Sequence, residues 1–230
     1  MQQIGLMMER PLLLSSVIDH AAQQFGDVEV VSRETNGSLF RYTYAQCAVR
    51  ARQLANALKR LGLKQGEAVG SIAWNNHRHL ELYYAVSGSG MVMHTSNPRL
   101  HAQQLIYVIN HAEDRAVFFD SSFAPLVQSV APHCPGVHTW VCLTDATNTH
   151  SIEGVVNVQS YDELIAGSSD QFEWPEFDER LAAAMCYTSG TTGHPKGVLY
   201  SHRAIVLNAM AGCMPGILSL SPNDTVLPVV

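Results

Sequence analysis

The alternation of apolar and polar residues near the start of the chain predicts a β-hairpin. Two short stretches rich in apolar residues, Glu29–Ser32 and Leu39–Tyr42, flank a polar segment that contains Asn36-Gly37. An Asn-Gly pair readily adopts the positive φ angles that tight hairpin turns require. The two stretches are therefore expected to pair as antiparallel strands.

A helix is predicted directly after the hairpin. Thr43 and Gln46 have the spacing of a capping box, in which two side chains satisfy free backbone N–H groups at a helix start. Apolar residues then repeat at helical spacing until Gly62, and glycine commonly follows the last residue of a helix. The apolar positions of this helix are Ala48, Ala51, Leu54, Ala55, Leu58 and Leu61.

From residue 68 onward, short apolar runs alternate with helical patterns. Runs that are apolar throughout and separated by helices are typical of a parallel sheet that helices cover on both faces. We therefore predict an α/β fold, with a mostly parallel, doubly wound sheet, flanking helices and an N-terminal β-hairpin. The extended runs are 68–74, 91–94, 116–120 and 139–143, and the helical patterns are 79–87, 102–111 and 125–130. Residues 144–180 lack strong periodicity apart from 161–165.

Two further strands are expected near the end of the chain. Leu181–Tyr187 is a short apolar run, and Val198–Ser201 is extended in character. Residues 202–211 then have a helical pattern. The polar segment between the two apolar runs is therefore expected to join one strand to another.

This connecting segment has the composition of an anion-binding loop. It contains four hydroxyl side chains, two glycines, one proline and one lysine. Glycines let successive backbone N–H groups turn toward one point, hydroxyls add donors, and the lysine adds a positive charge. A polyphosphate is the expected ligand. The candidate binding residues are Thr188, Ser189, Gly190, Thr191, Thr192, Gly193 and Lys196.

Two other interpretations of the loop are a Walker-type phosphate loop and an ordinary exposed hairpin loop. The commonest phosphate loop reads Gly-x-x-x-x-Gly-Lys-Ser/Thr and leads into a helix. Here His194 and Pro195 separate Gly193 from Lys196, and a strand is expected next. Spacing and context therefore exclude a Walker-type loop. The other alternative is an ordinary exposed hairpin loop, although such loops rarely combine four hydroxyls, paired glycines and a Pro-Lys-Gly end.

Composition and charge narrow the classes of function. The chain has 230 residues, a net charge of −6 at pH 7 and a pI near 6.0. It therefore lacks the basic field that binding to nucleic acid requires. Hydrophobic residues make up 47% and charged residues only 15%, against about 25% charged in an average protein. This predicts a large interior or a surface that awaits a partner.

The cysteines and the N-terminus indicate a cytoplasmic protein. Five scattered cysteines do not form a disulfide framework, so reduced thiols are expected. The N-terminus has no basic region, and charged residues and a proline interrupt its apolar runs, which argues against a signal peptide. The most membrane-like stretch, Ala204–Leu220, contains Pro215-Gly216 and falls short of the roughly 20 apolar residues of a spanning helix. A buried helix plus a turn is expected there.

Other groups of reactive residues favour structural roles. His133, Cys134, His138 and Cys142 lack the paired short spacings of structural zinc sites. Cys186 lies in a strand pattern with no base implied nearby, so core packing is expected.

Two sets of polar residues lie on helical segments. His77 and His79 begin an amphipathic helix on different faces and are expected to be solvated. Ser15 or Ser16 with Asp19 and His20 lies on one short segment, which cannot supply the converging geometry of a catalytic triad.

The segment Tyr187–Gly197 resembles the signature phosphate loop of the adenylate-forming superfamily, which includes acyl-CoA synthetases, peptide-synthetase adenylation domains and luciferases. Other segments are similar to the N-terminal part of fatty acyl-CoA ligases: 40–44, 66–69, 74–81 and 94–100. The resemblance covers most of residues 10–230. His94–Leu100, which reads His-Thr-Ser-Asn-Pro-Arg-Leu, points to the branch that activates medium- and long-chain fatty acids.

The resemblance implies a reaction in which a carboxylate attacks the α-phosphorus of ATP. Pyrophosphate leaves, and the thiol of coenzyme A captures the acyl-adenylate. It implies that the loop residues from Ser189 to Gly193 and Lys196 hold the β- and γ-phosphates, with Lys196 as the catalytic cation. It also implies that Thr188 helps to hold Mg²⁺, an ion that prefers oxygen ligands and leans on substrate phosphates. The implied partners are ATP, a fatty acid and a second copy of the chain in a dimer.

The resemblance also implies that residues 1–230 are the N-terminal portion of an AMP-binding domain with its phosphate loop at 187–197. The family's later motifs and its C-terminal domain do not occur before Val230, and the apolar run 225–230 is interpreted as a cut chain. We therefore expect an N-terminal fragment that is inactive alone. The alternatives are a non-catalytic interaction module, or an adenylate-forming enzyme that uses an aryl or amino acid.

Overall fold

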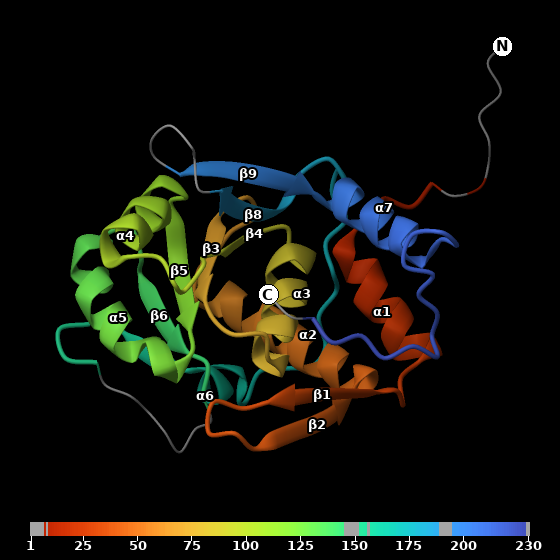
Figure 1. The fold of residues 1–230 in the computed structure, drawn as a ribbon, viewed down its shortest axis with the longest axis horizontal. Coiled ribbons are helices and arrows are strands. Elements are labelled where there is room, and N and C mark those ends of the chain that lie inside the picture. The colour runs from red at the N-terminus through yellow and green to blue at the C-terminus, as the bar shows by residue number, and fades with distance from the viewer. Residues whose placement is uncertain (1–6, 8, 145–151, 156, 189–194, 229–230) are drawn as a thin grey trace, which may run out of the picture.

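The computed structural model describes residues 7, 9–144, 152–155, 157–188 and 195–228. A seven-stranded sheet in the order β7-β6-β5-β3-β4-β8-β9 lies between two layers of helices (Figure 1). Neighbouring strands are parallel except β9, which runs antiparallel to β8. The predicted α/β fold is confirmed. The strands are β3 (Ala68–Ile72), β4 (Val92–Thr95), β5 (Asp114–Phe119), β6 (Thr139–Cys142), β7 (Val158–Ser160), β8 (Ala182–Thr188) and β9 (Lys196–Ser201).

The N-terminal hairpin forms as predicted and lies beside the sheet as a separate unit (Figure 1). Strand β1 (Glu29–Arg33) pairs antiparallel with β2 (Leu39–Thr43). Gly37 in the turn has a φ of 88°, which a residue with a side chain rarely adopts. The predicted helix is α2 (Tyr44–Arg60), and both hydrogen bonds of its capping box are present.

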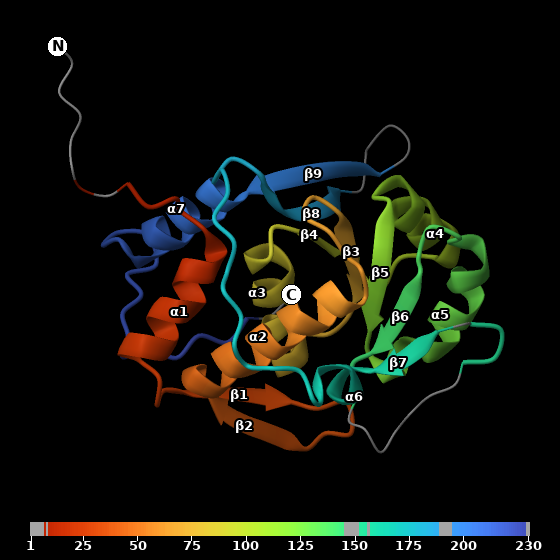
Figure 2. The same cartoon turned by 180° about the vertical axis from the view of Figure 1, so that it is seen from behind.

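One face of the sheet is covered by α2, α3 (His77–Gly88) and α6 (Tyr161–Ile165). Helix α1 (Leu14–Gln24) packs outside α2 and α3, as the view from behind also shows (Figure 2). The core on this face is aliphatic and aromatic, and its side chains alternate along each strand with those of the other face. It includes Leu54, Leu58, Val69, Leu82, Met93, Phe118, Val141 and Tyr161.

The opposite face is covered by α4 (Ala102–His111) and α5 (Ala124–Val130). Two short 3₁₀ helices, η1 (Ser121–Phe123) and η2 (Ala131–His133), flank α5. The core on this face includes Ile72, Leu105, Val108, Ile109, Val117, Phe119, Val127 and Trp140. The sheet is therefore buried on both faces over its central strands, as its uniformly apolar runs predict.

The sequence pattern missed one strand and misplaced the start of two others. Strand β9 begins at Lys196, two positions before the predicted start at Val198, because Lys196-Gly197 is not typical of a strand. Strand β7 was not predicted, because it has three residues and lies at the edge of the sheet, where one side chain of its Val-Gln-Ser sequence is polar and half-buried. Strand β5 begins at Asp114, two positions before the predicted start at Ala116. A carboxyl group at that position does not look like part of a buried strand, although Asp114 is fully buried.

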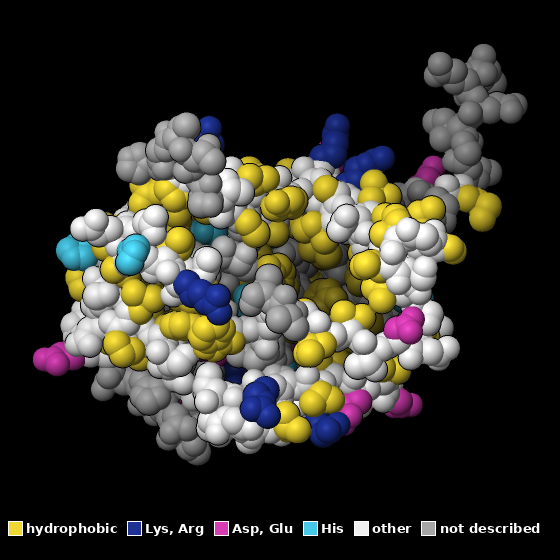
Figure 3. Space-filling model, in the orientation of Figure 1, with side chains coloured by type: hydrophobic (Ala, Val, Ile, Leu, Met, Phe, Trp, Pro, Cys, Tyr) yellow, Lys and Arg dark blue, Asp and Glu magenta, His cyan; other side chains and the backbone are white. Residues whose placement is uncertain are grey.

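The last helix, α7 (His202–Cys213), forms as predicted, but the expected burial of residues 204–220 is wrong for the described chain. Met210 is 58% and Leu218 66% exposed. An apolar side chain is buried only where another element packs on it, and α7 contacts chiefly α1, β8 and β9. Hydrophobic side chains gather over β9 and α7 in the space-filling view (Figure 3). Residues 225–228 form neither helix nor strand.

Candidate functional site

Strands β8 and β9 hold the two ends of the candidate phosphate loop opposite each other. Thr188 ends β8, Lys196 begins β9, and the two residues are partners in the antiparallel ladder. Both residues are exposed. The structure therefore brings together the hydroxyl and the cation that the sequence places at either end of the loop. The intervening candidates Ser189, Gly190, Thr191, Thr192 and Gly193 lie outside the described residues.

The loop begins at the carboxyl ends of the parallel strands. Thr95 of β4 lies beside Cys186 of β8, and the chain leaves both strands at the same edge of the sheet. In open α/β sheets, ligands bind outside this edge. The segment that follows β4, residues 96–101, therefore starts beside the first residues of the loop. This segment belongs to the stretch that also resembles fatty acyl-CoA ligases.

Tyr187, the residue before Thr188, is fixed by two histidines that sequence reasoning did not connect with the site. Its hydroxyl lies 2.6 Å from Nδ1 of His111, the last residue of α4. Its ring packs against that of His94, with 5.1 Å between the ring centroids. Burial raises the pKa of Tyr187 to about 12, so its hydroxyl keeps its proton at neutral pH.

His94 is itself held by a buried carboxyl group. Its Nδ1 lies 2.7 Å from Oδ2 of Asp114, and both side chains are fully buried. Burial raises the pKa of Asp114 above its ordinary value. A Cβ atom on Gly70 of β3 would lie 2.6 Å from Asp114 Oδ2, so glycine leaves the room that the carboxyl group occupies. In the sequence, Gly70 inside an apolar strand was the signal that another group approaches β3 closely.

Ser96, His94 and Asp114 have the connectivity of a Ser-His-Asp arrangement, but the geometry does not suit a nucleophile. Ser96 Oγ lies 3.4 Å from His94 Nε2, beyond the range of roughly 2.6 to 3.2 Å that a nucleophile and its base require. Ser96 is also only 8% exposed, so it belongs to the same buried group as His94 and Asp114. The three residues therefore support the strand end that carries the loop.

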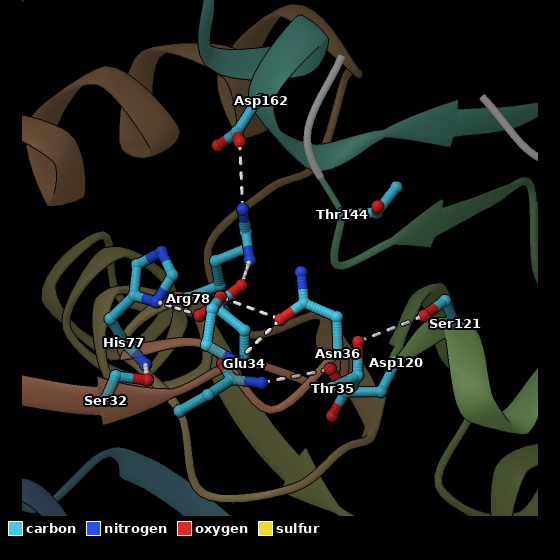
Figure 4. Close-up of polar contacts among 12 residues, drawn as sticks. Ser32, Glu34, Thr35, Asn36, His77, Arg78, Asp120, Ser121, Thr144 and Asp162 are labelled. Carbon is cyan, nitrogen blue, oxygen red and sulfur yellow. Dashed lines mark hydrogen bonds and ion pairs between the residues drawn. The ribbon is translucent and has the colours of Figure 1, made fainter. Parts of the chain in front are cut away.

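A second polar cluster lies where the hairpin meets the sheet (Figure 4). Arg78 Nη1 donates to Glu34 Oε2 at 2.6 Å, and Nη2 donates to Asp162 Oδ2 at 3.0 Å, so Arg78 lies between the two carboxylates. Nearby, Asp120 accepts a hydrogen bond from Asn76 Nδ2 at 2.9 Å, and burial raises its pKa to about 6. Because protein carboxylates bind both terminal nitrogens of the guanidinium, this cluster joins the hairpin to α3 and α6.

The prediction that His77 and His79 are solvated is wrong. His77 stacks on Phe40 of the hairpin, with ring centroids 3.9 Å apart, and is 1% exposed. His79 Nε2 lies 3.1 Å from Ser71 Oγ. The hairpin covers the first turn of α3, which a helical pattern alone does not reveal. Burial lowers the pKa of His77 to about 3 and that of His79 to about 4, so both rings are neutral at pH 7.

The other reactive residues that the sequence singled out contact protein groups. Cys186 is half-buried, with Sγ 3.2 Å from Thr95 Oγ1, so the core-packing prediction holds only in part. Asp19 pairs with Arg52. Over the described ranges, no three His, Cys, Asp or Glu residues are placed to share a metal ion. Nor does any helix of the described chain have the length and apolar character to span a membrane.

The sequence of the chain matches a known protein family. Residues 18–230 match the model of the family described as AMP-binding enzyme. The chain belongs to the AMP-binding enzyme family. The resemblance that the loop sequence suggested is thereby confirmed. The similar proteins include CoA ligases.

Two relatives share nearly half of the sequence. The 3-methylmercaptopropionyl-CoA ligase of Ruegeria lacuscaerulensis is 49% identical over 227 residues, which cover 99% of this chain and 42% of the relative. The medium-chain-fatty-acid–CoA ligase of Ectopseudomonas oleovorans is 47% identical over 227 residues, which cover 99% and 41%. The chain therefore spans about two-fifths of the length of these relatives.

The fold is also similar to solved structures of this class. An anthranilate CoA ligase in complex with anthranoyl-AMP aligns with a TM-score of 0.75 at 22% identity, over 87% of this chain and 37% of that structure. At this identity the match supports the fold alone.

Proposed function

We propose that this chain is the N-terminal part of an ATP-dependent acid–thiol ligase that joins a fatty acid to coenzyme A. In this reaction the carboxylate of the acid attacks the α-phosphorus of ATP and displaces pyrophosphate. The thiol of coenzyme A then attacks the acyl carbon of the acyl-adenylate and releases AMP. Residues 1–230 are proposed to form the N-terminal portion of the AMP-binding domain.

The observation that carries this proposal is the placement of Thr188 opposite Lys196 at the carboxyl edge of the sheet. The chain between them is rich in hydroxyl groups and glycine. Transfer reactions at phosphorus depend mainly on positioning and on neutralising charge that develops on the leaving group. Hydroxyl groups, backbone N–H donors and one lysine are the groups that supply both effects.

Each end of the loop has a proposed role. Lys196 is exposed, so its ammonium group is available to the oxygens of the departing pyrophosphate. Together with Ser189, Gly190, Thr191, Thr192 and Gly193, it would hold the β- and γ-phosphates.

Thr188 is exposed at the end of β8 and offers a neutral oxygen beside the proposed phosphate site. This fits Mg²⁺, which keeps few protein ligands and is bound largely through substrate phosphates. The ion would add positive charge next to the leaving pyrophosphate.

The relatives support a carboxylic acid with a flexible chain as the substrate. One is named for medium-chain fatty acids and the other for 3-methylmercaptopropionyl-CoA. A short thioether acid is therefore a second candidate substrate, since the relative named for it shares 49% of the residues. An aryl or amino acid remains the alternative within the family, and a non-catalytic interaction module the alternative outside it.

The test is a substrate panel with the complete polypeptide that contains residues 1–230. The protein is incubated with ATP, Mg²⁺, coenzyme A and one of octanoate, palmitate, 3-methylmercaptopropionate, benzoate or phenylalanine. AMP and the thioester are measured together by chromatography. We expect equal amounts of both products with at least one fatty acid. Products with only the aryl or amino acid would refute the substrate class, and no AMP with any acid would refute the ligase.

A further inference from the structure

Tyr187 lies at the base of the phosphate loop and contacts the elements on either side of it. We propose that Tyr187 is a positioning residue, which fixes both ends of the loop on the sheet so that Thr188 and Lys196 face one ligand. The proposal rests on the proposed function, because it names the residue that positions the phosphate loop.

The first line of evidence is the contact between Tyr187 and β9. Tyr187 and Gly197 are partners in the ladder between β8 and β9. A Cβ atom on Gly197 would lie 3.1 Å from Cζ and 3.3 Å from the hydroxyl oxygen of Tyr187, which is tighter than ordinary packing. The tyrosine ring therefore occupies the space that a side chain at position 197 would fill. Gly197 directly follows Lys196, so the ring covers the backbone next to the loop's cation.

The second line of evidence is the anchoring of the ring on the opposite side. Its hydroxyl lies 2.6 Å from His111 Nδ1, and the two rings meet edge to face with their centroids 5.7 Å apart. The ring also packs against His94, which the fully buried Asp114 holds at 2.7 Å. A buried, hydrogen-bonded pair on β4 and β5 and the end of α4 thus hold the tyrosine in place.

These contacts matter because β9 is an edge strand. Among the described strands it pairs only with β8, and all but the last of its residues are exposed. Edge strands with little burial specify their register weakly, and a slip of one residue turns every side chain to the other face. Lys196 and Val198, on either side of Gly197, both carry a Cβ that the ring would meet after such a slip. The fit between Tyr187 and Gly197 therefore favours the observed register, which keeps Lys196 opposite Thr188.

The test is a double-mutant cycle in the complete polypeptide, with Tyr187→Ala, Gly197→Ala and both together. Two readouts are taken: the steady-state constants for ATP, and hydrogen–deuterium exchange of peptides from residues 182–201. Misplacement of catalytic groups by about 1 Å costs roughly 100-fold. We therefore expect Tyr187→Ala to lower kcat/KM for ATP by about 10- to 100-fold and Gly197→Ala to lower it by less. Both variants should speed exchange in β8 and β9, while KM for coenzyme A stays unchanged.

The cycle also predicts how the changes combine. An alanine at position 197 requires the tyrosine ring to move by a few tenths of an ångström, so it is expected to cost much less in the Tyr187→Ala background. Tyr187→Phe keeps the ring and loses only the hydrogen bond to His111, so it is expected to have a small effect in the same direction. This variant keeps the test valid if Tyr187→Ala fails to fold.

A tyrosine elsewhere in the molecule serves as the matched control. Tyr84 is partly buried on α3 and packs against the cluster of Ile18, Tyr42 and Cys47. Tyr84→Ala is expected to lower the midpoint of urea unfolding without changing kcat/KM for ATP or exchange in β8 and β9.

Two outcomes would overturn the positioning role. The first is a Tyr187→Ala enzyme whose active fraction falls while kcat/KM for ATP per active site and exchange in β8 and β9 stay as in the wild type. The second is a Gly197→Ala cost that is the same with and without the ring. If the wild-type protein has no ligase activity, the proposed function fails by itself, and the exchange data from the cycle still decide whether Tyr187 fixes the hairpin.

Discussion

The ion pair between Arg50 and Glu81 joins α2 to α3 inside the molecule, and its removal should cost the fold a large share of its stability. Arg50 Nε donates to both carboxylate oxygens of Glu81, at 2.9 and 3.0 Å. The hydroxyl of the buried Tyr161 donates to the same carboxylate at 2.7 Å. Glu81 is fully buried, and the other end of Arg50 binds Asp162 at 2.9 Å. The perturbation is Glu81→Gln, which removes the charge and keeps the volume.

The structure sets the expected magnitude. Removing one partner of a buried ion pair costs about 3–5 kcal/mol, because the other charge stays buried without compensation. The Arg50 side chain is 24% exposed and keeps Asp162 as a partner, so we expect the lower end, about 3 kcal/mol. Each kcal/mol lowers Tm by about 2–4 °C in a domain of this size, which gives about 6–12 °C.

The assay is urea unfolding followed by circular dichroism, with Glu29→Gln as the matched control. Glu29 pairs with Arg41 at 2.6 Å, but these side chains are 48% and 54% exposed. Exposed pairs contribute about 0–1 kcal/mol, so this variant should unfold close to the wild type. If Glu81→Gln and Glu29→Gln lowered the free energy of unfolding by the same small amount, the reasoning from burial would be refuted.

Three further predictions concern pH, association and activity. Burial lowers the pKa of His79 from 6.5 to about 4, so the unfolded chain binds a proton that the folded chain does not. The free energy of unfolding should therefore fall as pH drops from about 6.5 to 4, by up to about 3 kcal/mol from this residue; a His79→Gln variant with an unchanged pH slope would contradict this. The exposed apolar residues of β9 and α7, such as Leu199 at 61%, should make the chain self-associate, and light scattering that shows a monomer at all concentrations would disprove it. Residues 1–230 alone should form no acyl-CoA, and a full-length rate from the purified chain would show that the residues of the reaction were misjudged.

The fold was predictable from sequence where its causes are local. The hairpin turn at Asn36-Gly37 and the capping box of Thr43 and Gln46 act over a few residues, and both form as expected. The central strands are buried on both faces, so their apolar runs indicate a parallel sheet directly. The burial of His77 was not predictable, because it depends on a hairpin that lies about 40 residues earlier in the chain and folds over α3.

The candidate site also has a part that the sequence predicts and a part that it does not. The loop between Thr188 and Lys196 was found because its hydroxyls, glycines and lysine are consecutive in sequence. The group that supports it was not found, since His94, His111 and Asp114 come from β4, α4 and β5. The register of the sheet and the packing of α4 decide that they meet Tyr187, and neither leaves a periodic pattern in the sequence.

Lys196 is proposed to serve the adenylation step, and ATP–pyrophosphate exchange measures that step by itself. The exchange is measured in the complete polypeptide with Mg²⁺ and a fatty acid, and compared between the wild type, Lys196→Ala and Lys64→Ala. Lys64 is an exposed lysine on the turn after α2, and its loss should leave the rate unchanged. Loss of one charge-assisted contact in the transition state costs roughly 2–4 kcal/mol, so Lys196→Ala should slow exchange by about 30- to 1000-fold. A Lys196→Ala enzyme that exchanged at the wild-type rate would contradict the proposed role of the loop.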